Sequence, residues 1–184
     1  MKIKPISLPD AYIVEPEPVE DNRGLFSRLF CREELQSILQ DKCIAQINHS
    51  VTRPKGAIRG MHFQYPPKAE AKMVKCLRGS VFDVIIDLRK DSPAFQKWHG
   101  EVLAAENMKM IFIPEGFAHG FQTMEKNCEL LYLHTEFYSP EHESGVCYDD
   151  PKIGIQWPLE PTEISDKDNS YARLSQDFGG IQLQ

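Results

Sequence analysis

The sequence of 184 residues lacks any apolar segment long enough for a signal peptide or a membrane span. It also lacks long runs of Lys and Arg, and its 27 acidic residues outnumber 21 basic ones, so no basic stripe is available to follow the phosphates of DNA or RNA. Repeats, low-complexity blocks and linkers are missing too. We therefore expect one cytoplasmic domain over residues 1–184, with neither a membrane nor a nucleic acid as partner.

Paired cysteines are also absent. The five cysteines are odd in number and lack the paired spacing of a zinc site; they are Cys31, Cys43, Cys76, Cys128 and Cys147. A disulfide framework and a zinc finger are both poor interpretations of this pattern. We expect buried thiols that stay reduced.

Helical patterns are scarce, whereas strand patterns recur. Only Arg32–Gln40 has apolar residues at helical spacing, with Glu33 and Glu34 in the expected first turn. Short runs of strand-forming residues lie between turns, at 43–47, 58–63, 72–77, 81–88, 110–113, 118–123 and 129–138. Many short strands indicate an all-β sandwich or barrel. From Asp149 onward the chain is rich in Pro, Asp and Ser, and we expect it to wrap the barrel as loops and short helical turns.

Two strand-like segments carry one histidine each and are the clearest clues to function. His62 lies in the apolar run 58–64, and His119 lies in 113–121, which has the pattern of a strand, a tight turn and a strand. Side chains alternate along strands, so three groups of residues are each expected to share a face that points inward. They are His62 and Gln64 on one strand, Lys72, Val74 and Cys76 on a second, and Tyr132, His134 and Tyr138 on a third. A barrel interior is normally apolar, so polar groups there have to be paired, hydrated or functional. The pattern suggests a walled cavity.

A metal site is a first interpretation of these histidines. Gly56, His62, Glu70 and His119 partly match the metal-binding pattern of cupins. Gln64 stands where a second histidine is needed, and Lys72 follows Glu70 closely, where its ammonium opposes a cation. We therefore predict that the site holds no metal. The alternative for His119 is a structural histidine hydrogen-bonded beneath a tight turn.

Motifs along almost the whole chain carry a family resemblance. They are Asp21-Asn-Arg-Gly-Leu-Phe26, Gln46-Ile-Asn48, Lys55-Gly-Ala-Ile-Arg-Gly-Met-His-Phe-Gln64, Pro66-Pro67 with Lys72, Phe82-Asp-Val84, Asp87-Leu-Arg89, Ile113-Pro-Glu-Gly-Phe-Ala-His-Gly-Phe121, Tyr132, Asp149-Asp-Pro151, Ile155-Gln-Trp-Pro158 and Ile164-Ser-Asp-Lys-Asp168. In this order and spacing the chain resembles the dTDP-4-dehydrorhamnose 3,5-epimerases. The resemblance implies a cupin-type double-stranded β-helix, a jelly-roll barrel, with a short N-terminal helix and short C-terminal helical turns.

The resemblance also implies a reaction and its catalytic residues. Enzymes of this family invert carbons beside the keto group of a nucleotide-linked sugar by proton removal and return, without a metal or redox cofactor. His62 would be the base, and Asp168 would hold its other ring nitrogen. Lys72 would stabilise the enolate oxygen, and Tyr132 would return a proton from the opposite face.

Substrate-binding residues follow from the same resemblance. Arg23 and Arg59 are the expected partners of the diphosphate, because a guanidinium can bind phosphate oxygens in bidentate fashion. The positions that match contacts to the sugar, base or ribose are Phe26, Gln46, Asn48, His119, Tyr138, Glu143 and Lys167. Arg59 and His62 have opposite strand parity, so both serve one ligand only if Gly60 bends the strand or Arg59 reaches a neighbouring subunit's site. The family resemblance implies a homodimer.

Each catalytic residue has a plainer interpretation from its own sequence context. His62 could be a core histidine bonded to a backbone carbonyl, and Asp168 could cap a short helix. Lys72 could be an exposed edge-strand lysine, and Tyr132 a half-buried strand aromatic.

The pattern of this chain also departs from the family at two positions. Arg28 stands where many members place an acidic side chain near the nucleotide base, and Glu70 stands where a glutamine is common, so the base need not be thymine. The alternatives are a monoepimerase or ketoisomerase on another nucleotide sugar, a metal-dependent dioxygenase, and a non-catalytic sugar-binding cupin.

Overall fold

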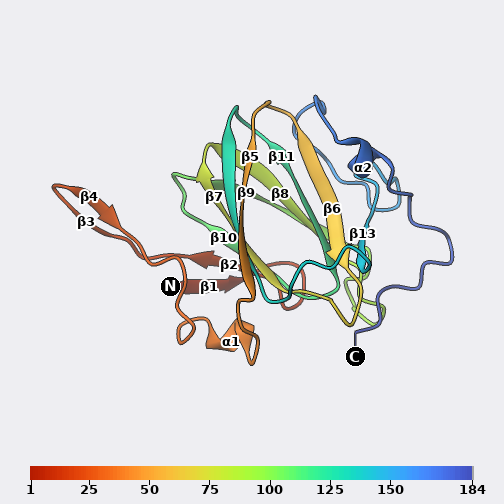
Figure 1. Cartoon of the computed structure of the whole chain (residues 1–184), viewed down its shortest axis with the longest axis horizontal. Helices are drawn as coiled ribbons and strands as arrows, with labels where there is room; N and C mark the ends of the chain where they lie inside the picture. Colours follow the sequence, from red (N-terminus) through yellow and green to blue (C-terminus); the bar gives the residue numbers. More distant parts are fainter. Residues whose placement is uncertain (184) are drawn as a thin grey trace.

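The computed structural model describes residues 1–183, and two antiparallel sheets form its body (Figure 1). The six-stranded sheet has the order β1 (Lys2–Pro5), β2 (Tyr12–Glu15), β10 (Met110–Ile113), β7 (Lys72–Arg78), β12 (Cys128–His134) and β5 (Gln46–Thr52). The five-stranded sheet has the order β13 (Glu143–Gly145), β6 (Ile58–Gln64), β11 (Phe117–Thr123), β8 (Ser80–Asp87) and β9 (Trp98–Ala104). The predicted all-β jelly roll is confirmed.

Apolar side chains from both sheets meet in one central core. Val74 and Leu130 come from the six-stranded sheet, and Ile85 and Phe121 come from the five-stranded sheet. Because neighbouring residues of a strand point to opposite faces, the residues next to these in the sequence point away from the central core. Tyr132 lies at the border of this core and packs against it. The core therefore supports the polar positions that lie next to it along the same strands.

The outer faces of the sheets are covered by other segments. Leu35 and Leu39, around the single turn of helix α1 (Gln36–Leu39), pack with Met73 and Leu133 on the outside of the six-stranded sheet. The C-terminal segment covers the outside of the five-stranded sheet, where Trp157 and Phe178 are among the residues that pack. Helix α2 (Asp166–Asn169) lies within this segment, beside β6 (Figure 1). The predicted wrapping of the tail is confirmed.

Strand β6 bends at Gly60, and this bend decides which side chains share a face. Gly60 has φ +134°, a backbone conformation that favours glycine, and the pairing of β6 with β11 shifts register opposite it. Consequently Arg59 and His62 line the same cavity, although their parity in a regular strand is opposite. The first of the two predicted arrangements, a bend at Gly60, is the one observed.

Several predicted boundaries are wrong. The helix expected over 32–40 is one turn only, and Glu34 binds the N-terminal amino group and Arg28 instead of lying in a first turn. The strand expected at 43–47 runs from Gln46 to Thr52, and the one expected to reach residue 138 ends at His134, where Thr135 bonds to Ala71. The sequence patterns also missed β1, β2, β3, β4, β9 and β13.

A separate hairpin projects from the barrel near the N-terminus. Strands β3 (Val19–Asp21) and β4 (Gly24–Phe26) pair only with each other among the described residues, and they extend away from both sheets (Figure 1). We call residues 19–26 the arm. Its apolar side chains are open to solvent, and Val19, Leu25 and Phe26 are 70%, 56% and 76% exposed.

The described residues include no helix long and apolar enough to cross a membrane. All five cysteines are free thiols. Only Cys76 and Cys128 are buried, whereas Cys43 is exposed, so the prediction of burial is wrong for Cys43. Cys31 and Cys147 are intermediate.

Candidate active site

A cavity of about 280 Å³ opens between the two sheets at the end of the core. Its walls come from both sheets and from the segments that join them. The lining residues are Gln46, Asn48, His49, Ser50, Arg59, His62, Phe63, Gln64, Glu70, Lys72, His119, Phe121, Tyr132, His134, Tyr138 and Glu143. Most side chains predicted to act on a ligand therefore gather at one place.

His62 is held by a carboxylate. Its Nε2 lies 2.7 Å from Asp168 Oδ1, and the other oxygen of Asp168 accepts the N–H of Gly60 at 3.1 Å. Burial by itself raises the pKa of Asp168, but the hydrogen bond and charge of His62, together with the bonds to Gly60 and Ser165, outweigh burial, and the pKa lies below its usual range. An ionised carboxylate can only accept, so Nε2 of His62 carries the proton and Nδ1 keeps a lone pair. His62 is thus arranged as a base.

The plainer interpretations of these two residues are excluded. Ser165 is the N-cap of α2, since its hydroxyl accepts the Asp168 N–H at 3.1 Å, and the Asp168 side chain turns inward instead. His62 bonds to a carboxylate and not to a backbone carbonyl.

Tyr132 faces the cavity from the opposite sheet. It lies on β12, and its hydroxyl is 3.0 Å from the hydroxyl of Ser50 on β5. Burial raises the pKa of Tyr132 to about 12, although the hydrogen bond with Ser50 acts in the other direction. The phenol therefore keeps its proton at neutral pH and can donate it. A base and an acid thus line one cavity from two facing sheets.

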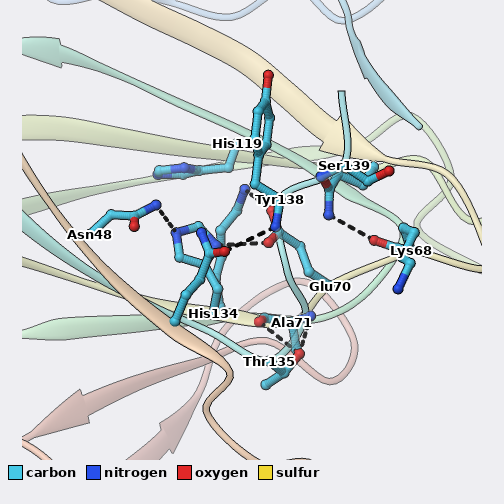
Figure 2. A network of polar contacts seen from close by, with 12 residues as sticks. Asn48, Lys68, Glu70, Ala71, His119, His134, Thr135, Tyr138 and Ser139 are labelled. Carbon is cyan, nitrogen blue, oxygen red and sulfur yellow. Dashed lines mark hydrogen bonds and ion pairs between the residues drawn. The ribbon is translucent and has the colours of Figure 1, made fainter. Parts of the chain in front are cut away.

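Lys72 is buried in the central strand β7, with only 7% of its side chain exposed. Its Nζ lies 3.2 Å from Glu70 Oε1. The second oxygen of Glu70 lies 2.7 Å from His134 Nδ1, a contact shown in Figure 2. Burial raises the pKa of Glu70, but Lys72 and His134 outweigh it and lower the pKa to about 2. Glu70 is therefore ionised at neutral pH. The interpretation of Lys72 as an exposed edge lysine is wrong.

His119 pairs with a third carboxylate. Its Nε2 lies 2.9 Å from Asp83 Oδ2, and both side chains are buried. Burial lowers the pKa of His119 more than the Asp83 charge raises it, so the ring is neutral at neutral pH. His119 is the cross-strand partner of His62 in the β11–β6 ladder. It is a buried, oriented polar group in the cavity wall, within a strand and not beneath a turn.

Polar groups continue from the cavity to its rim. The Gln46 side chain accepts the Tyr138 N–H at 2.9 Å. The Tyr138 hydroxyl and Lys167 Nζ both donate to Glu143 Oε2, at 2.6 Å each. The rim therefore presents an aromatic ring and a bridged carboxylate and ammonium. Asn48 lies beside His134, with 3.4 Å between its Nδ2 and the ring Nε2.

The residues that partly match the metal-binding pattern of cupins are engaged with other groups, since His62, Glu70 and His119 each pair with a side chain outside that pattern. The Gln64 amide donates to the Lys68 carbonyl at 2.8 Å and accepts the Ser139 N–H at 2.6 Å, so it braces loops. Within residues 1–183, no group of three or more His, Cys, Asp or Glu side chains is arranged to hold a metal ion.

Comparison with known proteins agrees with this geometry. The sequence model of the dTDP-4-dehydrorhamnose 3,5-epimerase family matches residues 5–176. The chain belongs to this family. It is 41% identical over 172 residues to the dTDP-4-dehydrorhamnose 3,5-epimerase of Salmonella typhimurium, covering 92% of this chain and 93% of that one.

Solved structures of the epimerase family are also similar. The Legionella pneumophila enzyme, crystallised with dTDP-4-keto-L-rhamnose, matches with a TM-score of 0.92 and 34% identity, covering 100% of this chain and 98% of that one. A 3'-monoepimerase from Streptomyces bikiniensis, in complex with dTDP-quinovose, matches with a TM-score of 0.86 and 32% identity, covering 92% and 86%. The chain is thus similar both to a 3,5-epimerase and to a 3'-monoepimerase.

Two residues expected in the epimerase site lie elsewhere in the structure. Arg23 and Phe26 belong to the arm and do not line the cavity. The Arg23 side chain is 90% exposed and, among the described residues, bonds only to Asp21 in the same hairpin, at 2.5 Å in its shortest contact. Within one chain, the arm extends away from the two sheets whose strands line the cavity (Figure 1).

Other residues at the cavity were not predicted to act on a ligand. Ser50, Asp83 and His134 contact predicted site residues, and Glu70 was noted only in the partial metal pattern and as a departure from the family. Strand register was the missing signal. His134 faces Lys72 across β12 and β7, and alternation alone placed His134 on the same face as Tyr132.

Proposed function

We propose that the protein is a dTDP-4-dehydrorhamnose 3,5-epimerase, which inverts C3 and C5 of dTDP-4-dehydro-6-deoxyglucose to give dTDP-4-dehydrorhamnose. The observation that carries the proposal is the pairing of a base and an acid across one cavity. His62 and Tyr132 lie on facing sheets, with the buried ammonium of Lys72 between the same walls. Inversion needs this arrangement, because a proton leaves one face of a carbon and another proton arrives on the opposite face.

The first step removes a proton beside the keto group. Nδ1 of His62 takes the proton from C3 or C5, and the electron pair of the broken C–H bond moves into the C4 carbonyl to form an enolate. Asp168 stabilises the resulting imidazolium through Nε2. The Lys72 ammonium stabilises the negative oxygen, and oxyanion donors of this kind contribute about 10² to 10³ in rate.

The second step returns a proton on the other face. Tyr132 donates its phenolic proton to the carbanionic carbon, and the carbonyl re-forms with inverted configuration. The raised pKa of Tyr132 supports this role, because the proton is still on the phenol when the enolate forms. The phenolate and the His62 imidazolium then exchange protons with water to restore the enzyme.

The proposed binding residues lie either in and around the cavity or on the arm. Arg59, Gln46, Asn48 and His119 line the cavity, and Tyr138, Glu143 and Lys167 form its rim; these are the proposed contacts to the diphosphate, sugar, base and ribose. Arg23 and Phe26 on the arm are proposed to reach the cavity of a second subunit in a homodimer. Exposed apolar side chains on a projecting hairpin are typical of a surface that another chain covers.

The cytoplasm is the proposed location, because free thiols persist in a reducing compartment. A second candidate is a monoepimerase, since a 3'-monoepimerase shares the fold. A monoepimerase needs the same four catalytic groups, so only the labelled product distinguishes the two activities.

The test is proton exchange in D₂O, followed by NMR with dTDP-4-keto-6-deoxyglucose as substrate. The proposal expects deuterium at both C3 and C5 and the appearance of the inverted sugar. Deuterium at one carbon only would establish the monoepimerase. No incorporation with this sugar or with analogues on other nucleotides would end the epimerase proposal and leave a sugar-binding cupin.

A further inference from the structure

Glu70 bridges two nitrogen-bearing side chains in the lining of the cavity. One carboxylate oxygen lies 3.2 Å from Lys72 Nζ, and the other lies 2.7 Å from His134 Nδ1. The three side chains are 10%, 7% and 12% exposed for Glu70, Lys72 and His134. Lys72 and His134 are also cross-strand partners. Any charge that Lys72 presents to a ligand is therefore shared with these two neighbours.

The summed charge of this wall depends on one proton. An ionised Glu70 cancels the charge of Lys72, so the three groups sum to zero while His134 is neutral. They sum to +1 when His134 is protonated. Nδ1 of His134 is occupied by Glu70, so the second proton goes to Nε2, which lies 3.4 Å from Asn48 Nδ2. When Nε2 is protonated, the Asn48 amide has to turn its oxygen toward the ring, because an amide nitrogen cannot accept a hydrogen bond. Imidazole is the side chain whose charge ordinarily changes near neutral pH.

A carboxylate beside the lysine works against the chemistry that lysine is assigned. An enolate oxygen is stabilised by positive charge in a site sheltered from water, and a neighbouring anion removes that benefit. A protonated His134 restores it. We propose that Glu70 and His134 are positioning residues for the epimerisation, and that they make enolate stabilisation by Lys72 depend on the proton of His134. This inference rests on the function proposed above.

The surroundings of His134 leave Glu70 as its partner. Tyr132 stacks on the His134 ring, with the two ring centroids 6.0 Å apart. Strand β5 brings the amides of Gln46 and Asn48 to this part of the cavity. It also brings the rim residue His49, which pairs with Glu129. The loop after β12 brings Tyr138 and Glu136, and Glu136 pairs with Lys68. Across the cavity stand His62, His119, Arg59 and Glu143. Among the described residues, Glu70 is the carboxylate that bonds to His134.

The inference predicts an alkaline limb in the pH profile. The rate falls where the wall gives up the proton on His134 and becomes neutral. In the wild-type protein we expect kcat/KM to fall on the order of tenfold along the alkaline limb, measured from about pH 6 to about pH 9.

Two substitutions test the limb from opposite directions. Glu70→Gln removes the carboxylate, so Lys72 keeps an uncompensated charge and the alkaline limb disappears, with activity retained at high pH. His134→Gln fixes the wall in its neutral state, so the rate is low at every pH and again has no alkaline limb. Glu136→Gln, a carboxylate outside the cavity in the ion pair with Lys68, keeps the wild-type profile.

Histidine ring NMR gives a readout that a purely structural role would not move. The ring signal that is missing from His134→Gln should change in the wild type over the same pH interval as the alkaline limb. Three results would overturn the inference. They are a wild type without an alkaline limb, a limb that survives in either variant, and a uniform loss of rate in Glu70→Gln with the limb unchanged. If Glu70→Gln does not fold, the His134→Gln profile decides. A wild type that exchanges no proton refutes the epimerase function itself, whereas an active enzyme with an unaltered limb refutes only this inference.

Discussion

The cavity and the arm differ in how their side chains find partners. In the cavity, His62, His119 and His134 each pair with a carboxylate, and the ammonium of Lys72 shares the Glu70 carboxylate with His134. On the arm, apolar side chains are exposed, and among the described residues Arg23 bonds only within its own hairpin. The cavity is thus preorganised within one chain, whereas the arm is incomplete within one chain. Preorganised groups act on the transition state, and an exposed arm can contribute to binding.

The largest effect should come from breaking the cavity at its base. His62→Ala is expected to lower the rate of deuterium incorporation by about 10³-fold or more, because no other group is placed to take the proton. NMR in D₂O measures it. The control is His99→Ala, since His99 lies on the edge strand β9 outside the cavity lining. Comparable exchange in His62→Ala and wild type would remove His62 from the mechanism.

Lys72→Met should lower kcat by about 10² to 10³, because the enolate loses its cation. Lys75→Met is a closely matched control. Lys75 is also buried on β7, but its Nζ donates to the Met108 carbonyl at 2.7 Å, away from the cavity. It should lose stability without losing turnover per folded molecule. Equal losses of kcat in the two variants would contradict the role of Lys72.

Tyr132→Phe should separate proton removal from inversion. His62 can still remove and return a proton on one face, so substrate recovered from D₂O should carry deuterium without inversion, while net inversion falls about 10²-fold. NMR of the recovered sugar reads both. The control is Tyr148→Phe, outside the cavity lining. Inversion at the wild-type rate would assign the proton to another donor.

Acidification should weaken the cavity before it affects the arm. The pKa of Glu70 is about 2 in the folded protein and near 4.5 for a free glutamate, so its contribution to stability is present above about pH 4.5 and is lost as pH falls toward about 2. We expect that contribution to be on the order of 2–3 kcal/mol. Urea unfolding of Glu70→Gln should show a shallower dependence of the free energy of unfolding on pH over this interval. Glu160→Gln, at an exposed position, should retain the wild-type slope.

The smallest effect is expected on the arm. Arg23→Ala should raise KM about tenfold with kcat nearly unchanged, because only uniform binding of the substrate is lost. The melting temperature should stay within error, since the side chain is 90% exposed. Arg78→Ala is the control, because Arg78 is also exposed and in a surface ion pair. Light scattering should report that the protein is a dimer. An Arg23→Ala variant that is a monomer and keeps the wild-type KM would show that the arm does not contribute to the substrate site.

The same comparison explains what the sequence could and could not predict. The barrel and the gathering of polar side chains in its cavity were predictable, because alternation along strands identifies inward faces and the motifs identify the family. Strand β9 and helix α1 were misjudged, since β9 is mostly half-buried and mixes polar with apolar residues, and α1 depends on contacts of Leu35 and Glu34 with distant segments. The Glu70–His134 pair joins residues 64 positions apart and needed the pairing of β7 with β12, which no local pattern contains.

The bend at Gly60 has a consequence for how this barrel can vary. A Cβ atom at Gly60 would lie 2.5 Å from Gly120 Cα, and one at Gly120 would lie 2.6 Å from the Arg59 carbonyl oxygen. Neither position can accept a side chain while the other strand stays in place. In a saturation mutagenesis screen, positions 60 and 120 should behave as one intolerant unit, although neither residue has a functional group of its own.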